Sequence, residues 1–136
     1  MELTRYPLQD YCALLAREGL LAAPLPAGLD LERTVELVCC DSRQVGPGTL
    51  FICKGAHFRP EFLSQAARQG AFAYVSETSY PQVELPCILV SDLRRAMARL
   101  AVMYYNDPSR RLPVIGVTGT KGKSSTTYYL KYILDE

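Results

Sequence analysis

The sequence has no excess of basic residues, no paired-cysteine motif and no long apolar run, and each absence excludes a class of protein. Its 136 residues carry 15 basic and 14 acidic side chains, whereas dedicated nucleic-acid binders carry a clear basic excess. The longest uncharged stretch, residues 19–29, contains two prolines and is too short to cross a bilayer. We therefore expect no nucleic-acid partner and no membrane insertion.

The five cysteines do not follow the spacing of a zinc site. Their number is odd, no C-x-x-C pair occurs, and the single histidine, His57, has no ligand partner nearby. Zinc sites instead pair thiols two to four residues apart. The first residues also lack the apolar core of a signal peptide. Small apolar thiols in a reducing compartment are the simplest interpretation, so we expect a cytoplasmic protein.

Apolar spacing and turn residues predict an α/β chain. The predicted helices repeat apolar side chains every three to four positions between capping residues, and the predicted strands are short apolar runs between turns. The helices span residues 7–18, 60–69, 93–105 and 124–134, and the strands span residues 34–41, 49–53, 71–76, 86–90 and 113–118. In the helix over residues 60–69, we expect Phe62, Ala66 and Ala67 to face inward.

A glycine-rich turn between the last predicted strand and the last predicted helix has the composition of a phosphate-binding loop. It reads Gly119-Thr120-Lys121-Gly122-Lys123-Ser124-Ser125. Glycines let successive backbone N–H groups point into one hollow, and the following helix adds free donors and the positive end of its dipole. In such loops the lysine neutralises phosphate oxygens and the next hydroxyl ligates Mg²⁺. The strict G-x-x-x-x-G-K-[ST] spacing fails because Val117 replaces the first glycine, so the strand–loop–helix context carries the prediction.

Several segments together resemble the Mur ligases, which build the peptidoglycan stem peptide. Residues 114–125 are similar to the ATP loop of that family, and residues 104–109 are similar to the segment that precedes the loop in its MurE-type members. The segments similar to the amino-terminal domain of MurE and MurF are Asp41-Ser42-Arg43, residues 46–51, Lys54-Gly55 and residues 66–75.

The resemblance implies a fold, an activity and a set of site residues. The fold is α/β: a small amino-terminal domain with a mixed sheet, then the first strand, P-loop and helix of a truncated ATPase domain. The activity is that of a ligase that uses ATP and Mg²⁺ to add the third amino acid to UDP-N-acetylmuramoyl-L-alanyl-D-glutamate through an acyl phosphate. The implied domains are residues 1–91 for the UDP-linked substrate, 92–111 as connecting helix and linker, and 112–136 for ATP.

The same resemblance assigns roles to individual residues. Cys40 and Ser42 would lie at the uridine end of the substrate, and Ala56, His57 and Phe58 would flank the nucleotide. Residues 119–125 would hold the ATP phosphates, with Lys123 catalytic and Ser124 as the Mg²⁺ ligand. The other metal ligands, the adenine pocket and the amino-acid site of such an enzyme are missing, so we expect the 136-residue chain alone to be inactive as a ligase.

Other interpretations stay open at this point. A MurF-type ligase shares the amino-terminal pattern, and a stand-alone nucleotide-sugar-binding module would also fit. Taken singly, Ser42 suits a turn and His57 suits a surface loop, while the tyrosines at positions 128, 129 and 132 suit packing more than base stacking. A parallel strand needs neighbours, and a helix of about a dozen residues is marginal alone in water. We therefore expect residues 113–134 to pack on their own domain or on another chain.

Overall fold

The structure is a computed structural model that describes residues 2–135. Helices are interspersed with strands along this range, and the predicted α/β class is confirmed. The elements are α1 (Leu8–Arg17), β1 (Leu37–Cys39), β2 (Thr49–Ile52), α2 (Pro60–Gln69), β3 (Ala71–Ser76), β4 (Cys87–Leu89), α3 (Leu93–Tyr104), the 3-10 turn η1 (Pro108–Arg110) and α4 (Lys123–Leu134). All four predicted helices form within one residue of the expected ends. None of the helices in the described range is long and apolar enough to span a bilayer.

The strands β1 to β4 pair in sequence order, and every pairing is parallel. The prediction of a mixed sheet is therefore wrong. Between β2 and β3, helix α2 carries the chain back to the starting edge, as a parallel pair requires. Between β1 and β2 there is no helix. Residues 40–48 are nevertheless long enough to return along strands of three and four residues.

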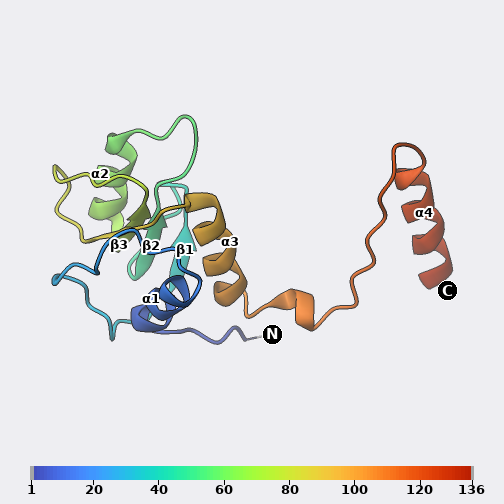
Figure 1. Cartoon of the computed structure of the whole chain (residues 1–136), viewed down its shortest axis with the longest axis horizontal. Coiled ribbons are helices and arrows are strands. Elements are labelled where there is room, and N and C mark those ends of the chain that lie inside the picture. Colours follow the sequence, from blue (N-terminus) through green and yellow to red (C-terminus); the bar gives the residue numbers. More distant parts are fainter. Residues whose placement is uncertain (1, 136) are drawn as a thin grey trace.

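Helices cover both faces of the sheet (Figure 1). Side chains alternate between the faces along each strand, so Leu50 and Val75 pack with buried residues of α1 and α3. Phe51 and Tyr74 point the other way and pack with α2. The molecule thus has three layers, with α1 and α3 on one side of the sheet and α2 on the other.

The orientation of α2 differs from the prediction at one residue. Leu63 and Ala66 are fully buried against the sheet, whereas Phe62 is 40% exposed. Leu63, Ala66 and Ala67 share the face that packs on the sheet, and Phe62 lies about 100° to the side of Leu63 on the helix. The expectation that Phe62 faces inward is wrong, and its ring is left on the surface beside the carboxyl edge of the sheet.

Residues 112–135 lie apart from the three layers (Figure 1). The predicted strand over residues 113–118 does not form, because no strand in the described range runs beside it to accept its hydrogen bonds. Val114 and Ile115 are 75% and 63% exposed, and the three tyrosines of α4 are 72–79% exposed. Packing on its own domain, one of the two expected possibilities, is therefore wrong for the chain as described. Packing of this segment and its tyrosines on another chain stays a prediction.

Candidate functional site

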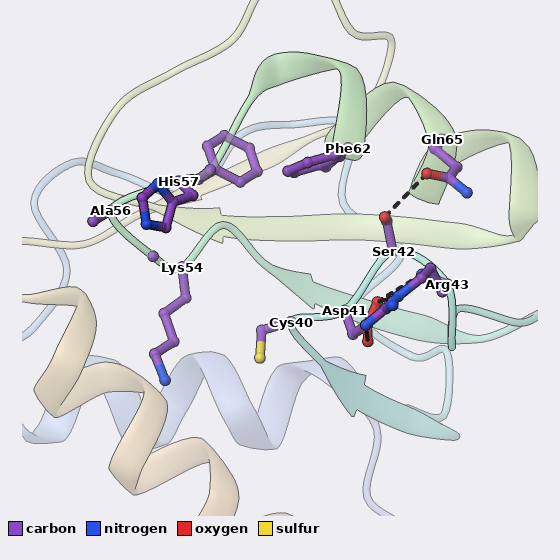
Figure 2. Close-up of a pocket in the computed structure, with 11 residues that line it drawn as sticks. Cys40, Asp41, Ser42, Arg43, Lys54, Ala56, His57, Phe62 and Gln65 are labelled. Carbon is purple, nitrogen blue, oxygen red and sulfur yellow. Dashed lines mark hydrogen bonds and ion pairs between the residues drawn. The ribbon is translucent and has the colours of Figure 1, made fainter.

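A pocket of about 760 Å³ opens at the edge of the sheet where β1 and β2 end. The two strands are parallel, so the loops that follow them leave the sheet at the same edge, which is where open α/β sheets bind ligands. Helix α2 forms another side of the pocket (Figure 2). The lining residues are Cys40, Asp41, Ser42, Arg43, Lys54, Gly55, Ala56, His57, Phe58, Phe62 and Gln65.

The loop after β1 is held in a tight turn by Asp41. Its carboxylate accepts hydrogen bonds from the Arg43 backbone N–H at 3.0 Å, Nε at 2.9 Å and Nη2 at 2.7 Å. These bonds from Arg43 lower the pKa of Asp41 to about 2, so the pair is ionised at neutral pH. The Asp41 carbonyl also accepts from the Gln44 N–H at 3.0 Å. The turn presents Ser42, which is only 7% exposed, to the pocket.

Ser42 and α2 meet inside the pocket. The Ser42 hydroxyl donates to Gln65 Oε1 at 3.1 Å, and Figure 2 shows the two side chains pointing toward each other with Phe62 beside them. Phe62 and Gln65 are three residues apart and therefore share one face of the helix. The Phe58 ring meets Phe62 edge-on at a centroid separation of 6.5 Å and Tyr80 at 5.4 Å. The pocket thus combines an exposed aromatic surface with one partly buried hydroxyl–amide pair.

The loop after β2 supplies the opposite rim. Gly55 adopts φ +116°, a conformation that favours glycine, and its carbonyl accepts from the Phe58 N–H at 3.1 Å. This turn leaves Ala56 and His57 exposed. Lys54 forms no ion pair with any residue of the described range. Its ammonium and the Cys40 thiol point away from Ser42 (Figure 2).

All five residues that the resemblance assigns to the UDP-linked substrate line this one pocket. They are Cys40, Ser42, Ala56, His57 and Phe58. Sequence reasoning did not assign Lys54, Phe62 or Gln65, which line it as well. For the last two, a usable signal was present, because a helix that follows a candidate binding loop places residues three apart on a single side.

The predicted phosphate-binding loop lies apart from this pocket (Figure 1). Gly122 is the N-cap of α4 with φ +76°, and no side chain caps the helix. The first N–H bonded within the helix is that of Thr126, to the Gly122 carbonyl at 3.0 Å, so the amides of Lys123, Ser124 and Ser125 keep the free donors of a helix start. Those donors, together with an exposed lysine at the first helical position, suit an oxyanion.

No protein-family model matches this chain, but curated proteins do. The chain is 39% identical over 126 residues to the UDP-N-acetylmuramyl-tripeptide synthetase of Lactobacillus delbrueckii subsp. bulgaricus, a match that covers 92% of the chain and 24% of that protein. It is 47% identical over 102 residues to the protein of the same name in Limosilactobacillus reuteri, covering 74% of the chain and 20% of the relative. It is 43% identical over 104 residues to the UDP-N-acetylmuramoyl-L-alanyl-D-glutamate--L-lysine ligase of Enterococcus faecalis, covering 76% and 20%.

A solved structure has the same fold. A crystal structure of MurF from Acinetobacter baumannii aligns with a TM-score of 0.62 at 24% identity, covering 99% of this chain and 28% of that one. The chain therefore spans about a quarter of the length of the curated relatives it matches. The identities to the tripeptide synthetases and to the lysine ligase, together with the agreement in fold, show that this chain belongs to the Mur ligase family.

Proposed function

We propose that the pocket at the carboxyl edge of β1 and β2 binds the uridine diphosphate end of a UDP-N-acetylmuramoyl peptide. One observation carries this proposal: the two loops that match the family, separated in sequence by β2, converge on one cavity together with an aromatic side chain of α2. Relatives that are 38–47% identical are named for a UDP-linked muramoyl substrate. The residues assigned to the substrate are Cys40, Ser42, Ala56, His57 and Phe58.

The chemistry of the pocket suits a nucleotide. A base can stack on the exposed Phe62 ring, an interaction worth about 1–3 kcal/mol per base. Ser42 and Gln65 offer hydrogen bonds to the edge of that base. Lys54 has no protein counter-ion in the described range and can neutralise a diphosphate oxygen. Arg43 is committed to Asp41 and contributes less net charge.

Residues 119–125 are proposed to hold the phosphates of ATP. The phosphates approach the backbone of Gly119, Thr120, Lys121 and Gly122, and Lys121 adds positive charge. Lys123 is the catalytic cation. The amides of Lys123, Ser124 and Ser125 bind phosphate oxygens. Ser124 would hold Mg²⁺, which supplies charge neutralisation at the phosphates when it is bound. We accordingly assign residues 1–91 to the substrate, 92–111 to the connecting helix and linker, and 112–136 to ATP.

The whole enzyme is proposed to be an ATP-dependent tripeptide synthetase of the MurE type. The γ-phosphoryl group of ATP passes to the D-glutamyl side-chain carboxylate, giving an acyl phosphate and ADP. The amine of the incoming amino acid then attacks the acyl carbon, and phosphate leaves with the original carboxylate oxygen. Most of such catalysis is positioning and charge stabilisation. The higher identity to tripeptide synthetases and lysine ligases favours this reaction over that of MurF, for which the match is 24% identical.

The compartment is proposed to be the cytoplasm. ATP is the co-substrate, and all five cysteines are free thiols: Cys12, Cys39, Cys40, Cys53 and Cys87. Free thiols of this number suit a reducing environment.

Isothermal titration calorimetry of the 136-residue chain tests the substrate pocket. We expect UDP and UDP-N-acetylmuramoyl-L-alanyl-D-glutamate to bind at one site. Phe62→Ala should weaken binding about 5- to 100-fold through loss of stacking, and Ser42→Ala should weaken it about 2- to 10-fold through loss of a hydrogen-bond partner. Tyr129→Ala removes an aromatic ring that is more exposed and lies outside the pocket, and it should change nothing. Absence of UDP binding, or equal losses in Phe62→Ala and Tyr129→Ala, contradicts the proposal.

A further inference from the structure

The hydrogen bond between Ser42 and Gln65 fixes which side chain donates and therefore which hydrogen-bonding groups are left for a ligand. A serine alone would not fix this. We propose that Gln65 is a positioning residue that fixes the Ser42 hydroxyl as an acceptor toward the ligand, and that the pair thereby selects a uracil base over cytosine. This inference rests on the proposed function, since it assumes that a nucleotide base enters the pocket beside Ser42.

The hydrogen of the Ser42 hydroxyl is already used within the protein. A serine hydroxyl has one hydrogen to donate and two lone pairs that accept. In the structure, the hydrogen is given to Gln65 Oε1 at 3.1 Å. Ser42 is 7% exposed, so solvent does not compete freely for that hydrogen. With its only donor engaged, the oxygen of Ser42 offers the ligand lone pairs alone.

The Gln65 amide binds Ser42 through its oxygen and not through its nitrogen, Nε2. When Oε1 accepts from Ser42, the Nε2 amino group keeps its two N–H donors. The pair therefore offers the base an acceptor, Ser42 Oγ. The pairing edge of uracil is complementary, because its N3–H donor lies between two carbonyl acceptors. Cytosine has a lone pair on N3 instead, which would face the lone pairs of Ser42 Oγ.

Among the residues that the structure describes, Gln65 supplies the side chain that is hydrogen-bonded to the Ser42 hydroxyl. Asp41 and Arg43, on either side of Ser42 in the chain, are bonded to each other through Nε at 2.9 Å and Nη2 at 2.7 Å. Phe58 and Phe62, which lie nearby in the pocket, have no polar atoms in their side chains. The direction of the Ser42 hydrogen therefore depends on Gln65.

The test compares UDP with CDP by calorimetry on the 136-residue chain. Wild type should bind UDP at least about 10-fold more tightly than CDP, since burying two facing acceptors leaves both unsatisfied. Gln65→Met removes the acceptor, so the hydroxyl can turn and donate to N3 of cytosine. The ratio of the two dissociation constants should then fall at least about 5-fold. Gln65→Glu keeps an acceptor for Ser42 and should weaken both ligands while retaining a preference for UDP. Gln69→Met, on the same helix outside the pocket, is the control.

The outcomes separate this inference from the proposal on which it rests. Equal weakening of UDP and CDP by Gln65→Met, with an unchanged ratio, would mean that Gln65 supports the pocket without setting its polarity, and overturns the inference. A wild type that binds UDP and CDP equally, or a Gln65→Glu variant that loses the preference as fully as Gln65→Met, overturns it too. In all three cases UDP binding, and with it the proposed function, survives. Failure of wild type to bind UDP contradicts the proposed function itself.

Discussion

Substituting alanine for Gly70 tests how tightly the end of α2 is docked against residues 46–47, which precede β2. Gly70 ends α2 with φ +117°, and a Cβ built there would lie 2.7 Å from Pro47 N and Cα and 2.9 Å from the Gly46 carbonyl carbon. These are backbone atoms, so no side-chain rotation relieves the overlap. The loop cannot move freely either, because the Thr49 hydroxyl donates to the Gly46 carbonyl at 2.7 Å and accepts from its N–H at 3.2 Å.

The expected cost has two parts. A non-glycine residue in a left-handed conformation costs about 1–2 kcal/mol, and forcing an extra methyl group into a packed contact costs about 1–3 kcal/mol. Gly70→Ala should therefore lower the free energy of unfolding by about 2–5 kcal/mol. Gly19→Ala is a matched control. Gly19 also has a positive φ, +67°, but a Cβ there would meet nothing within 4 Å, so only the first cost applies.

Urea denaturation followed by circular dichroism measures both variants. With a slope of about 1–3 kcal/mol per molar urea, the midpoint of Gly70→Ala should fall by at least about 0.7 M relative to wild type, and clearly below that of Gly19→Ala. If the two variants were equally stable, α2 would not be pressed against residues 46–47 as described, and the account of how α2 docks at this edge of the sheet would be refuted.

Three further predictions concern thiols, pH and the end of the chain. Cys40 is exposed, whereas burial raises the pKa of Cys12 to about 11 and of Cys53 to about 12. A thiol-labelling reagent at pH 8 should therefore modify Cys40 first and reach Cys12 and Cys53 only on unfolding; rapid labelling of Cys53 in the folded chain argues against its burial. The same two thiols should make the chain less stable above pH 9, since the unfolded thiols ionise near 9.0 and the folded ones do not. The loss should be at most about 1.4 kcal/mol per pH unit per group, measured as urea midpoints at pH 8 and 10.5 under reducing conditions, and a constant midpoint contradicts it. Brief chymotrypsin treatment should cut after Tyr128 or Tyr129 of α4, which are 72% and 73% exposed, before it cuts within residues 2–104; early cleavage inside α1 or α3 speaks against the three-layer core.

Sequence patterns identified the helices because their signals are local. Gly19 and Gly70 follow α1 and α2 with positive φ, as helix-ending glycines do. The Asp92 side chain accepts from the Arg95 N–H at 3.0 Å, as a capping aspartate should. Each of these signals depends on residues within a few positions of the helix end, so the chain itself contains the information.

The features that sequence patterns missed depend on distant partners. Phe62 and Leu63 are both apolar neighbours on one helix, and only the position of the sheet and pocket decides which of them is buried. The apolar run over residues 113–118 has the composition of a strand, but a strand forms only beside another strand, and the described range offers none there. Parallel pairing of β1 with β2 was equally invisible, because a connection without a helix is compatible with either direction.

In the candidate site, too, sequence patterns identified one part and missed another. The resemblance identified both loops of the pocket, and the structure brings them together. It did not single out Gln65, because the significance of that residue arises from its hydrogen bond with a serine 23 positions away. A helix position gains a role in recognition only when the fold places it against a loop.

The most direct test of the central claim is a titration of ¹⁵N-labelled chain with UDP, followed residue by residue by NMR. If the pocket at the carboxyl edge of β1 and β2 receives the nucleotide, the amide signals of residues 40–43 and 54–58, together with those of Phe62 and Gln65, should shift and saturate with one dissociation constant. Shifts confined to residues 119–125, or spread along α1 and the carboxyl end of α3, would contradict the claim.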